Sequence, residues 1–157
     1  MGWHFWRGEQ VAMAATQFQG MGQKATRRLA LLIGINRYEA RNEWLPLNGC
    51  LTDVELQKEL LIHRFGFKPA DILTLTDHQA TRQGIETAIL EHLVAQAMPD
   101  DWVVVHFSGH GTLLGDHRAL VPVDGSIPHG NREIQDIPEA RLWQWLAAVN
   151  SEKYCVC

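Results

Sequence analysis

The residues of this chain that are best suited to chemistry lie in the stretch Ser108-Gly109-His110-Gly111, directly after a largely apolar run at 102–107. Glycine on both sides of His110 lets the backbone turn sharply and lets another segment approach closely. The same glycines leave the imidazole accessible, which a general base requires. A histidine after a strand is more often an ordinary turn residue, and the two glycines are what favour the catalytic interpretation.

Other kinds of site fit this stretch less well. A phosphate-binding loop would need a Lys-Ser/Thr pair and a following helix, and neither pattern is present. A serine-hydrolase elbow needs Gly-x-Ser-x-Gly, and the residue two positions before Ser108 is not glycine. His106, His110 and His117 could in principle bind zinc, but their spacing matches no recognised ligand pattern. The sequence therefore predicts no metal site here.

Apolar runs and helical patterns alternate along the chain and must position these residues. Continuous apolar runs predict strands that are buried on both faces. Thr52 with Glu55 forms a capping-box pattern that predicts a helix start, and Thr81 is expected to cap the next helix. The inner face of the first helix is predicted to be Val54, Leu60, Leu61 and Phe65, and that of the second to be Ile85, Ala88, Ile89, Leu93 and Ala97. Strands are predicted at 29–36, 71–77, 102–107, 118–125 and 153–157, and helices at 52–65, 81–97 and 138–149.

This order of elements predicts an α/β fold, a three-layer α-β-α sandwich around a mostly parallel sheet. Such sheets carry their chemistry at the carboxyl ends of the strands, and His110 follows one of those ends. With 157 residues the chain has room for one domain, predicted at 28–157, after a poorly ordered lead-in at 1–27.

Composition narrows the possible partners and compartments. A net charge of −4 gives no reason to expect a nucleic-acid partner, and no apolar run reaches the roughly 18 residues of a membrane span. Three cysteines, two of them two positions apart at Cys155 and Cys157, do not form a disulfide framework. A reducing compartment, the cytoplasm, is therefore expected.

Four blocks of the sequence together resemble a known family. "RRLALLIGINRY", "LNGCLTDVELQKELL", "VVVHFSGHG" and "ALVPVDG" are similar to the caspase-like cysteine peptidases of clan CD (peptidase C14), in the order and spacing of that family. The best resemblance is to the metacaspase branch of bacterial type, which includes the orthocaspases. It implies a caspase-like fold, incomplete at its C-terminus, and a cysteine endopeptidase that cleaves polypeptides after Arg or Lys through a Cys-His dyad.

The resemblance also implies roles for individual residues. His110 matches the catalytic histidine, and Asp53 matches an acid of the pocket that binds the basic substrate side chain. Cys50 and Ser108 match neighbours of that acid. Taken without the resemblance, Asp53 is a helix first-turn residue stabilised by the helix dipole, and Cys50 is a small core residue.

The sequence departs from the family at its end. The family nucleophile lies in a motif resembling Asp-x-Cys-His-Ser-Gly after the last predicted strand, and this motif is not present. Cys157 is a weak substitute because it falls inside that strand, and Cys155 is expected to be core. The chain is therefore expected to be a p20-like portion that is inactive without a p10-like C-terminal portion. The alternative is a non-catalytic caspase-like binding module or the remnant of a truncated gene.

Calcium is the one cofactor that the resemblance raises. Asp124 fits one aspartate that the family often uses for Ca²⁺, and Asp136 stands where the family often has a pair. Two carboxylates are few for an ion that takes six to eight oxygens. Calcium therefore stays open, and no metal or other cofactor is assigned.

Overall fold

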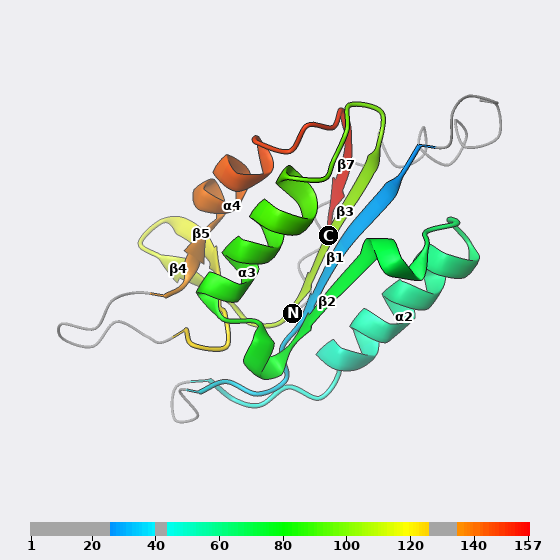
Figure 1. Cartoon of the computed structure of the whole chain (residues 1–157). Helices are drawn as coiled ribbons and strands as arrows, with labels where there is room; N and C mark the ends of the chain where they lie inside the picture. The colour runs from blue at the N-terminus through cyan, green and yellow to red at the C-terminus, as the bar shows by residue number, and fades with distance from the viewer. Residues whose placement is uncertain (1–25, 40–43, 126–134) are drawn as a thin grey trace.

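A four-stranded parallel sheet forms the centre of the domain (Figure 1). The structure, a computed structural model, describes residues 26–39, 44–125 and 135–157. Six of the seven residues of the first strand are buried, as expected for a strand covered on both faces. The predicted parallel sheet is thus confirmed. In spatial order its strands are β2 (Ile72–Thr76), β1 (Arg28–Gly34), β3 (Trp102–Ser108) and β7 (Lys153–Val156).

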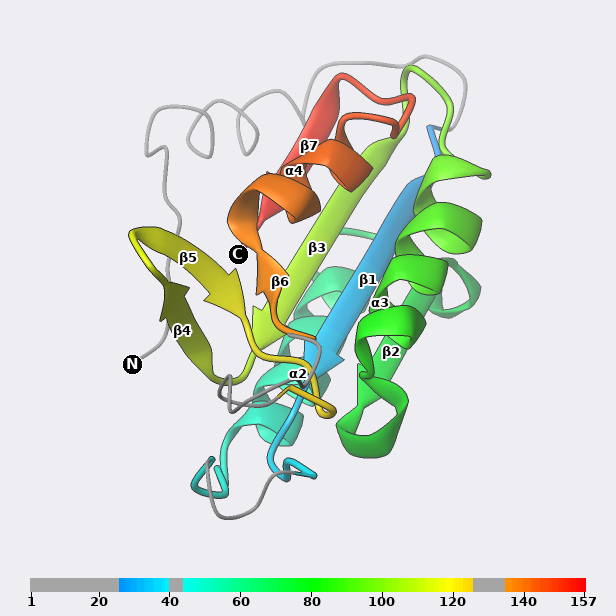
Figure 2. The same ribbon diagram turned by 90° about the vertical axis from the view of Figure 1, so that its left-hand side faces the viewer.

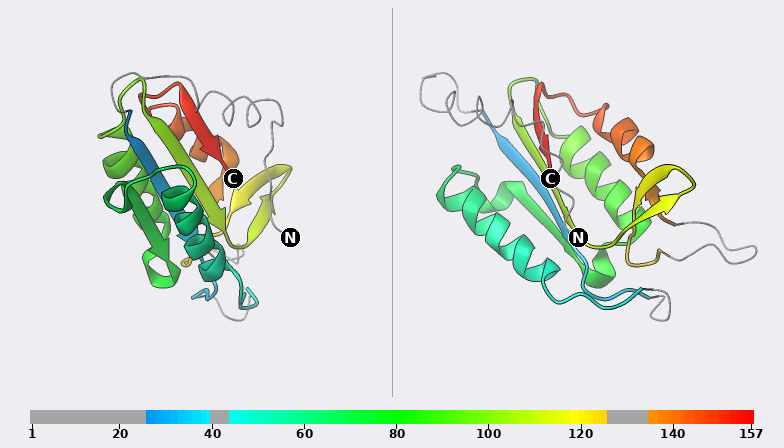
Figure 3. Two further views of the ribbon diagram at one scale, coloured as in Figure 1. Left: turned by 90° about the vertical axis from the view of Figure 1, so that its right-hand side faces the viewer. Right: turned by 180° about the vertical axis from the view of Figure 1, so that it is seen from behind.

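Helices cover both faces of this sheet and complete the predicted three-layer sandwich (Figures 1 and 3). Helix α2 (Cys50–His63) covers one face, and α3 (Arg82–Ala88) and α4 (Glu139–Leu146) lie on the other. Successive side chains of a strand point to opposite faces. Accordingly, Ala30 and Leu32 pack in the core under α2, whereas Leu29, Leu31 and Ile33 pack in the larger core under α3 and α4.

The helix after β2 agrees with the sequence-based prediction. The hydroxyl of Thr81 caps it by accepting the N–H of Gly84 at 2.9 Å. The chain continues past α3 as a π-helical stretch, Ile89–Val94, so the helical rod is longer than α3 itself. All five residues of the predicted inner face are buried: Ile85, Ala88, Ile89, Leu93 and Ala97.

The start of α2 differs from the prediction. The helix begins at Cys50, and its N-cap residue Gly49 makes no side-chain cap, so the Thr52–Glu55 capping box is wrong. The N–H of Cys50 instead donates to the side-chain oxygen of Asn36 at 2.9 Å, a partner two residues after the end of β1. Val54 and Leu61 are buried as predicted, but Leu60 and Phe65 are 45% and 36% exposed.

A small antiparallel sheet stands beside the main one and was only partly expected (Figure 2). It contains β4 (Gly111–Leu114), β5 (His117–Leu120) and β6 (Ile137–Pro138). The predicted strand at 118–125 therefore ends early and lies outside the parallel sheet. Gly115, with φ +62°, takes the first position of the two-residue turn between β4 and β5, where glycine fits a II′ hairpin.

Two further sequence-based predictions concern membrane spans and the N-terminal lead-in. In the part that the structure describes, no helix has the length and apolar character to cross a bilayer. Nearly all of the predicted lead-in at 1–27 lies outside the described residues, so the domain boundary at residue 28 stays a prediction.

Candidate active site

His110 lies two residues after β3, at the carboxyl edge of the sheet, and is half-buried. Its ring nitrogen Nε2 is 2.7 Å from the backbone carbonyl oxygen of Leu45. A carbonyl oxygen only accepts hydrogen bonds, so this contact requires the proton on Nε2. In the neutral ring the lone pair then belongs to Nδ1, which is the nitrogen that can accept a proton.

Two aromatic side chains from the loop after β1 hold this ring in place. The rings of Tyr38 and Trp44 lie 5.0 and 5.3 Å from that of His110, centroid to centroid. The hydroxyl oxygen of Tyr38 also accepts the backbone N–H of His110 at 2.7 Å. Burial raises the pKa of Tyr38 well above its ordinary value near 10, so the hydroxyl stays neutral.

The structure explains why glycine precedes His110. A Cβ atom at Gly109 would lie 2.8 Å from both the hydroxyl oxygen of Tyr38 and the ring tip of Phe107. The predicted close approach of another segment is therefore confirmed, and that segment is the Tyr38 loop. Gly109 does not have a positive φ, so a left-handed backbone is not the reason for glycine here. The reason is the tight packing against Tyr38 and Phe107.

Asp53 and Ser108 meet at the same edge of the sheet. The Ser108 hydroxyl donates to Oδ2 of Asp53 at 2.6 Å, joining the end of β3 to the first turn of α2. Asp53 is exposed, and it gains from the positive end of the helix dipole. The contact holds an exposed carboxyl group against Ser108, which lies two residues before His110 in the chain.

Cys50 is buried at the start of α2, as expected of a small core residue, and its place in the substrate pocket stays a prediction. A Cβ atom at Gly34 would lie 2.7 Å from the Cys50 carbonyl oxygen, so only glycine at the end of β1 allows α2 to begin this close. The structure thus places Cys50, Asp53, Ser108 and His110 at one edge. Sequence reasoning missed Asn36, Tyr38 and Leu45; the polar Asn36 and the aromatic Tyr38 near the end of a buried strand were a visible signal, whereas Leu45 contributes only its backbone carbonyl.

Cys157 lies beside His106 and not beside His110. Its backbone N–H donates to Val105, and its carbonyl accepts from Phe107, both at 2.9 Å. Its sulfur lies 3.8 Å from the Val105 carbonyl oxygen. A hydrogen bond to the Cys155 thiol, together with burial, raises the pKa of Cys157, so this thiol resists becoming the thiolate that a nucleophile requires.

Cys155 is exposed, so the expectation that it is core is wrong. It lies on β7, one of the two edge strands of the four described, opposite Val104 of β3. The hydrogen bond from Cys157 lowers the pKa of Cys155 to about 7.

The two aspartates considered for calcium are engaged with Arg82. Oδ1 of Asp124 accepts the backbone N–H of Arg82 at 2.8 Å, and the Arg82 guanidinium donates to the backbone carbonyl of Asp136 at 2.7 Å. Across residues 26–39, 44–125 and 135–157, no group of three or more His, Cys, Asp or Glu side chains could hold a metal ion. A calcium requirement therefore stays an open prediction, and no chemistry is derived through it.

Comparison with known proteins agrees with the resemblance. The model of the metacaspase, peptidase C14 domain matches residues 28–136. Metacaspase-1 of Meyerozyma guilliermondii is 36% identical over 113 residues, which cover 69% of this chain and 25% of that protein. Metacaspase-9 of Arabidopsis thaliana is 41% identical over 111 residues, which cover 66% of this chain and 32% of that protein. The chain thus spans about a quarter to a third of these relatives, which come from a fungus and a plant. A bacterial source stays a prediction.

A solved structure of a Geobacter sulfurreducens protein supports the fold. It matches with a TM-score of 0.63 at 22% identity, covering 83% of this chain and 48% of that one. With the family model matched over most of the described sheet and through the Ser108–His110 edge, the chain belongs to the metacaspase family of peptidase C14 domains.

Proposed function

We propose that this chain supplies the catalytic histidine and the first pocket acid of a cysteine endopeptidase that cleaves polypeptides after Arg or Lys. The observation that carries the proposal is the orientation of His110. Its Nε2–H is fixed on the Leu45 carbonyl, and its ring is held by Tyr38, so Nδ1 is left as the proton acceptor. Metacaspase membership supplies the reaction class.

In this mechanism Nδ1 of His110 accepts the proton of a cysteine thiol, and the thiolate attacks the carbonyl carbon of the peptide bond. The imidazolium then gives that proton to the leaving amine, and an acyl-enzyme remains. Water, with His110 again as base, hydrolyses the thioester and frees the cysteine. The Leu45 carbonyl stabilises the imidazolium, because its hydrogen bond strengthens when the donor becomes charged.

Asp53 provides the preference for basic substrates. Ser108 uses one carboxylate oxygen, Oδ2, and so fixes the orientation of the group. The other oxygen would accept a hydrogen bond from the guanidinium of Arg or the ammonium of Lys. Cys50, Asp53 and Ser108 together form the proposed pocket, next to the base.

The register of the sheet supports a nucleophile that lies outside the present sequence. Strand β7 runs parallel to β3 with Val156 beside Val105. If the strand continues in this register, the second residue after Cys157 lies beside Ser108 and the fourth lies beside His110. Those positions have the spacing of the Asp-x-Cys pair of the family motif. Accordingly, we propose that the thiol and a second pocket acid come from a continuation of β7, in a p10-like portion.

The experiment compares this chain with the product of the longer reading frame in the source DNA. The 157-residue chain should not hydrolyse an Arg- or Lys-terminated fluorogenic peptide above background. The longer product should hydrolyse it and lose activity in His110→Ala. Asp53→Ala should raise KM for Arg substrates more than it lowers kcat, because it removes binding of the basic side chain. Hydrolysis by the short chain that Cys157→Ala abolishes would refute the register argument.

A stop codon after Cys157, followed by unrelated sequence, would favour the alternative of a caspase-like binding module or a gene remnant. We also propose that the protein works in the cytoplasm. All three cysteines are free thiols, which suits a reducing environment of that kind.

A further inference from the structure

Asp77, directly after β2, is the one residue other than glycine with positive φ in the described chain, at 42°. This left-handed backbone disfavours side chains with a Cβ, although aspartate tolerates it better than most. Strained residues of this kind persist where surrounding contacts hold them, and they gather at functional sites. Asp77 is not part of the proposed dyad or pocket, so its strain calls for an explanation.

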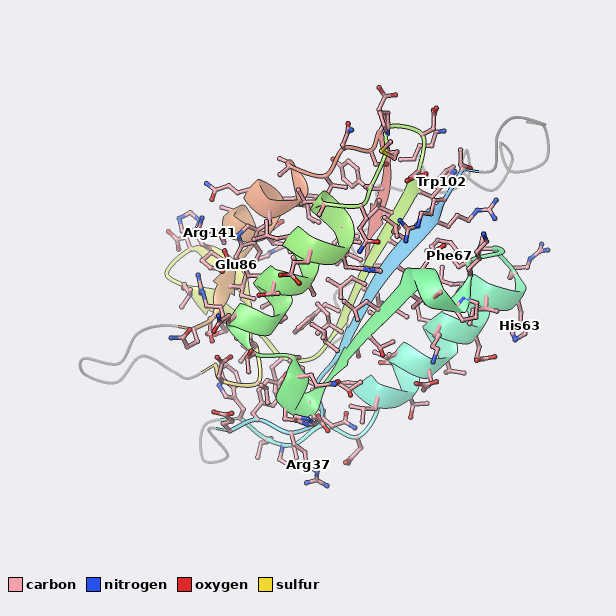
Figure 4. The ribbon with its side chains drawn as sticks, viewed as in Figure 1. Arg37, His63, Phe67, Glu86, Trp102 and Arg141 are labelled. Carbon is pink, nitrogen blue, oxygen red and sulfur yellow. The ribbon has the colours of Figure 1, made fainter. Side chains whose placement is uncertain are left out.

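The Asp77 carboxylate binds the chain where it leaves β1. Its oxygen Oδ1 accepts two backbone N–H groups, that of Asn36 at 2.8 Å and that of Arg37 at 3.1 Å. Strands β1 and β2 are paired up to Gly34 and Thr76, so this contact lies one step beyond the ladder. It fixes the direction in which the loop leaves the sheet. Arg37 marks this edge in Figure 4, at the opposite end of the sheet from Trp102.

Asn36, which Asp77 holds at the start of the loop, also binds the end of the loop and the start of α2. Its carbonyl accepts the N–H of Leu47 at 2.8 Å, which closes the segment between β1 and α2. Its side-chain oxygen holds the N–H of Cys50 at 2.9 Å and so sets the first residue of α2. The residue that Asp77 holds therefore anchors the base of the loop and the helix that carries Asp53.

The closed loop carries the described contacts to the His110 ring, whereas the His110 carbonyl accepts the N–H of Val121, after β5, at 3.0 Å. Tyr38 binds the backbone N–H of His110, Trp44 packs on its ring, and the Leu45 carbonyl binds Nε2. From this juxtaposition we propose that Asp77 is a positioning residue that, through Asn36, holds the loop which fixes the ring orientation and tautomer of His110. That this orientation matters for catalysis rests on the proposed peptidase function. The claim that Asp77 maintains the orientation does not depend on that function.

Three substitutions at Asp77 separate the effect of its carboxylate as a hydrogen-bond acceptor from the effect of its strained backbone. Asp77→Ala removes the carboxylate and keeps a Cβ at positive φ. Asp77→Gly removes the carboxylate and relieves the strain, so it should fold even if Asp77→Ala does not. Asp77→Asn keeps an Oδ1 acceptor and tolerates the same backbone. The matched control is Asp101→Ala at the other end of the sheet, where a carboxylate also accepts two backbone N–H groups, those of Arg27 and Met98.

The readout is the imidazole of His110 in ¹H–¹⁵N NMR spectra of the 157-residue chain, assigned with His110→Gln because the chain has eight histidines. The wild type and Asp77→Asn should show one tautomer, with the proton on Nε2. Asp77→Gly should show mixed tautomers and roughly tenfold faster exchange of that proton with solvent. Asp101→Ala should keep the wild-type signals, although it is destabilised.

A wild-type His110 spectrum in Asp77→Gly would overturn the proposal. So would equal disorder of His110 in Asp101→Ala, because that outcome would reflect general loss of stability. Neither measurement needs peptidase activity, so failure of this inference and failure of the proposed function are distinguishable. In the active longer product, Asp77→Gly should lower kcat more than it raises KM, and Asp77→Asn should restore most of kcat.

Discussion

The two ends of the parallel sheet use the same kind of contact for different results. At the amino end, the Asp101 carboxylate accepts the backbone N–H groups of Arg27 and Met98 at 2.8 and 3.0 Å, and Asp101 is 5% exposed. At the carboxyl end, Asp77 also accepts two backbone N–H groups, both on Oδ1, but is only half-buried. Figure 4 shows both ends, marked by Trp102 and Arg37.

The difference lies in what each contact supports. The residues at the amino end bind one another: the Arg27 side chain donates to the Asp71 carboxylate, and the Asp101 carbonyl accepts the hydroxyl of Ser151. Contacts at the carboxyl end continue outward, through the loop after β1, to the half-buried ring of His110. The hydrogen bonds at the amino end therefore mainly stabilise the fold. Those at the carboxyl end orient side chains that are accessible to a substrate.

The largest effect is expected where α2 approaches the carboxyl end. Gly34→Ala should lower the free energy of unfolding by about 2–3 kcal/mol, because the new Cβ would meet the backbone carbonyl of Cys50, which has little room to move. Gly49→Ala is the matched control, since nothing lies within 4 Å of its added Cβ. Urea denaturation measures both. A loss below about 0.5 kcal/mol in Gly34→Ala would mean that α2 shifts freely.

The next prediction contrasts two carboxylates directly. Asp101→Ala should cost about 2 kcal/mol in unfolding free energy, because it removes a buried carboxylate and leaves two part-buried backbone N–H groups without their acceptor. Asp53→Ala should cost less than about 0.5 kcal/mol, because Asp53 is exposed and the Ser108 hydroxyl can turn to water. Equal losses in the two variants would remove the distinction between a stabilising end and a functional end.

A pH dependence should follow from Tyr38. Burial raises its folded-state pKa above the unfolded value near 10, so its contribution to stability is present below pH 10 and is lost as the pH rises further. The unfolding free energy should then fall by up to about 1.4 kcal/mol per pH unit from this group. Tyr38→Phe should show a shallower fall between pH 10 and 11.5. An identical slope in both proteins would show that Tyr38 titrates normally.

The smallest effect is expected from the ion pair at the amino end. Arg27 lies 2.8 Å from Asp71, but its side chain is 41% exposed, so solvent screens the attraction. Arg27→Ala should cost less than about 1 kcal/mol, and 0.5 M salt should reduce the difference from wild type. A larger, salt-independent loss would indicate that the packed stem of Arg27, and not its charge, stabilises this end.

The candidate site could be predicted only in part. Glycines around His110 predicted an accessible histidine with a close neighbour, and the Tyr38 hydroxyl beside Gly109 agrees with this. The Thr52–Glu55 capping box was wrong because Asn36, fourteen residues away, binds the first N–H of α2. Cys155 was expected to be core because it shares a strand face with Cys157, but β7 is an edge strand of the four described strands and Cys155 is exposed.

By itself, the sequence determined the layers of this protein: short continuous apolar runs such as that of β1, alternating with helical patterns, indicate strands covered on both faces. It also determined that His110 follows a strand end. Only the tertiary structure decided how His110 is oriented and that Asp77 anchors the loop holding it. Those contacts join segments about 40 to 70 residues apart, and no local pattern encodes a hydrogen bond whose partner is chosen by the packing of neighbouring strands.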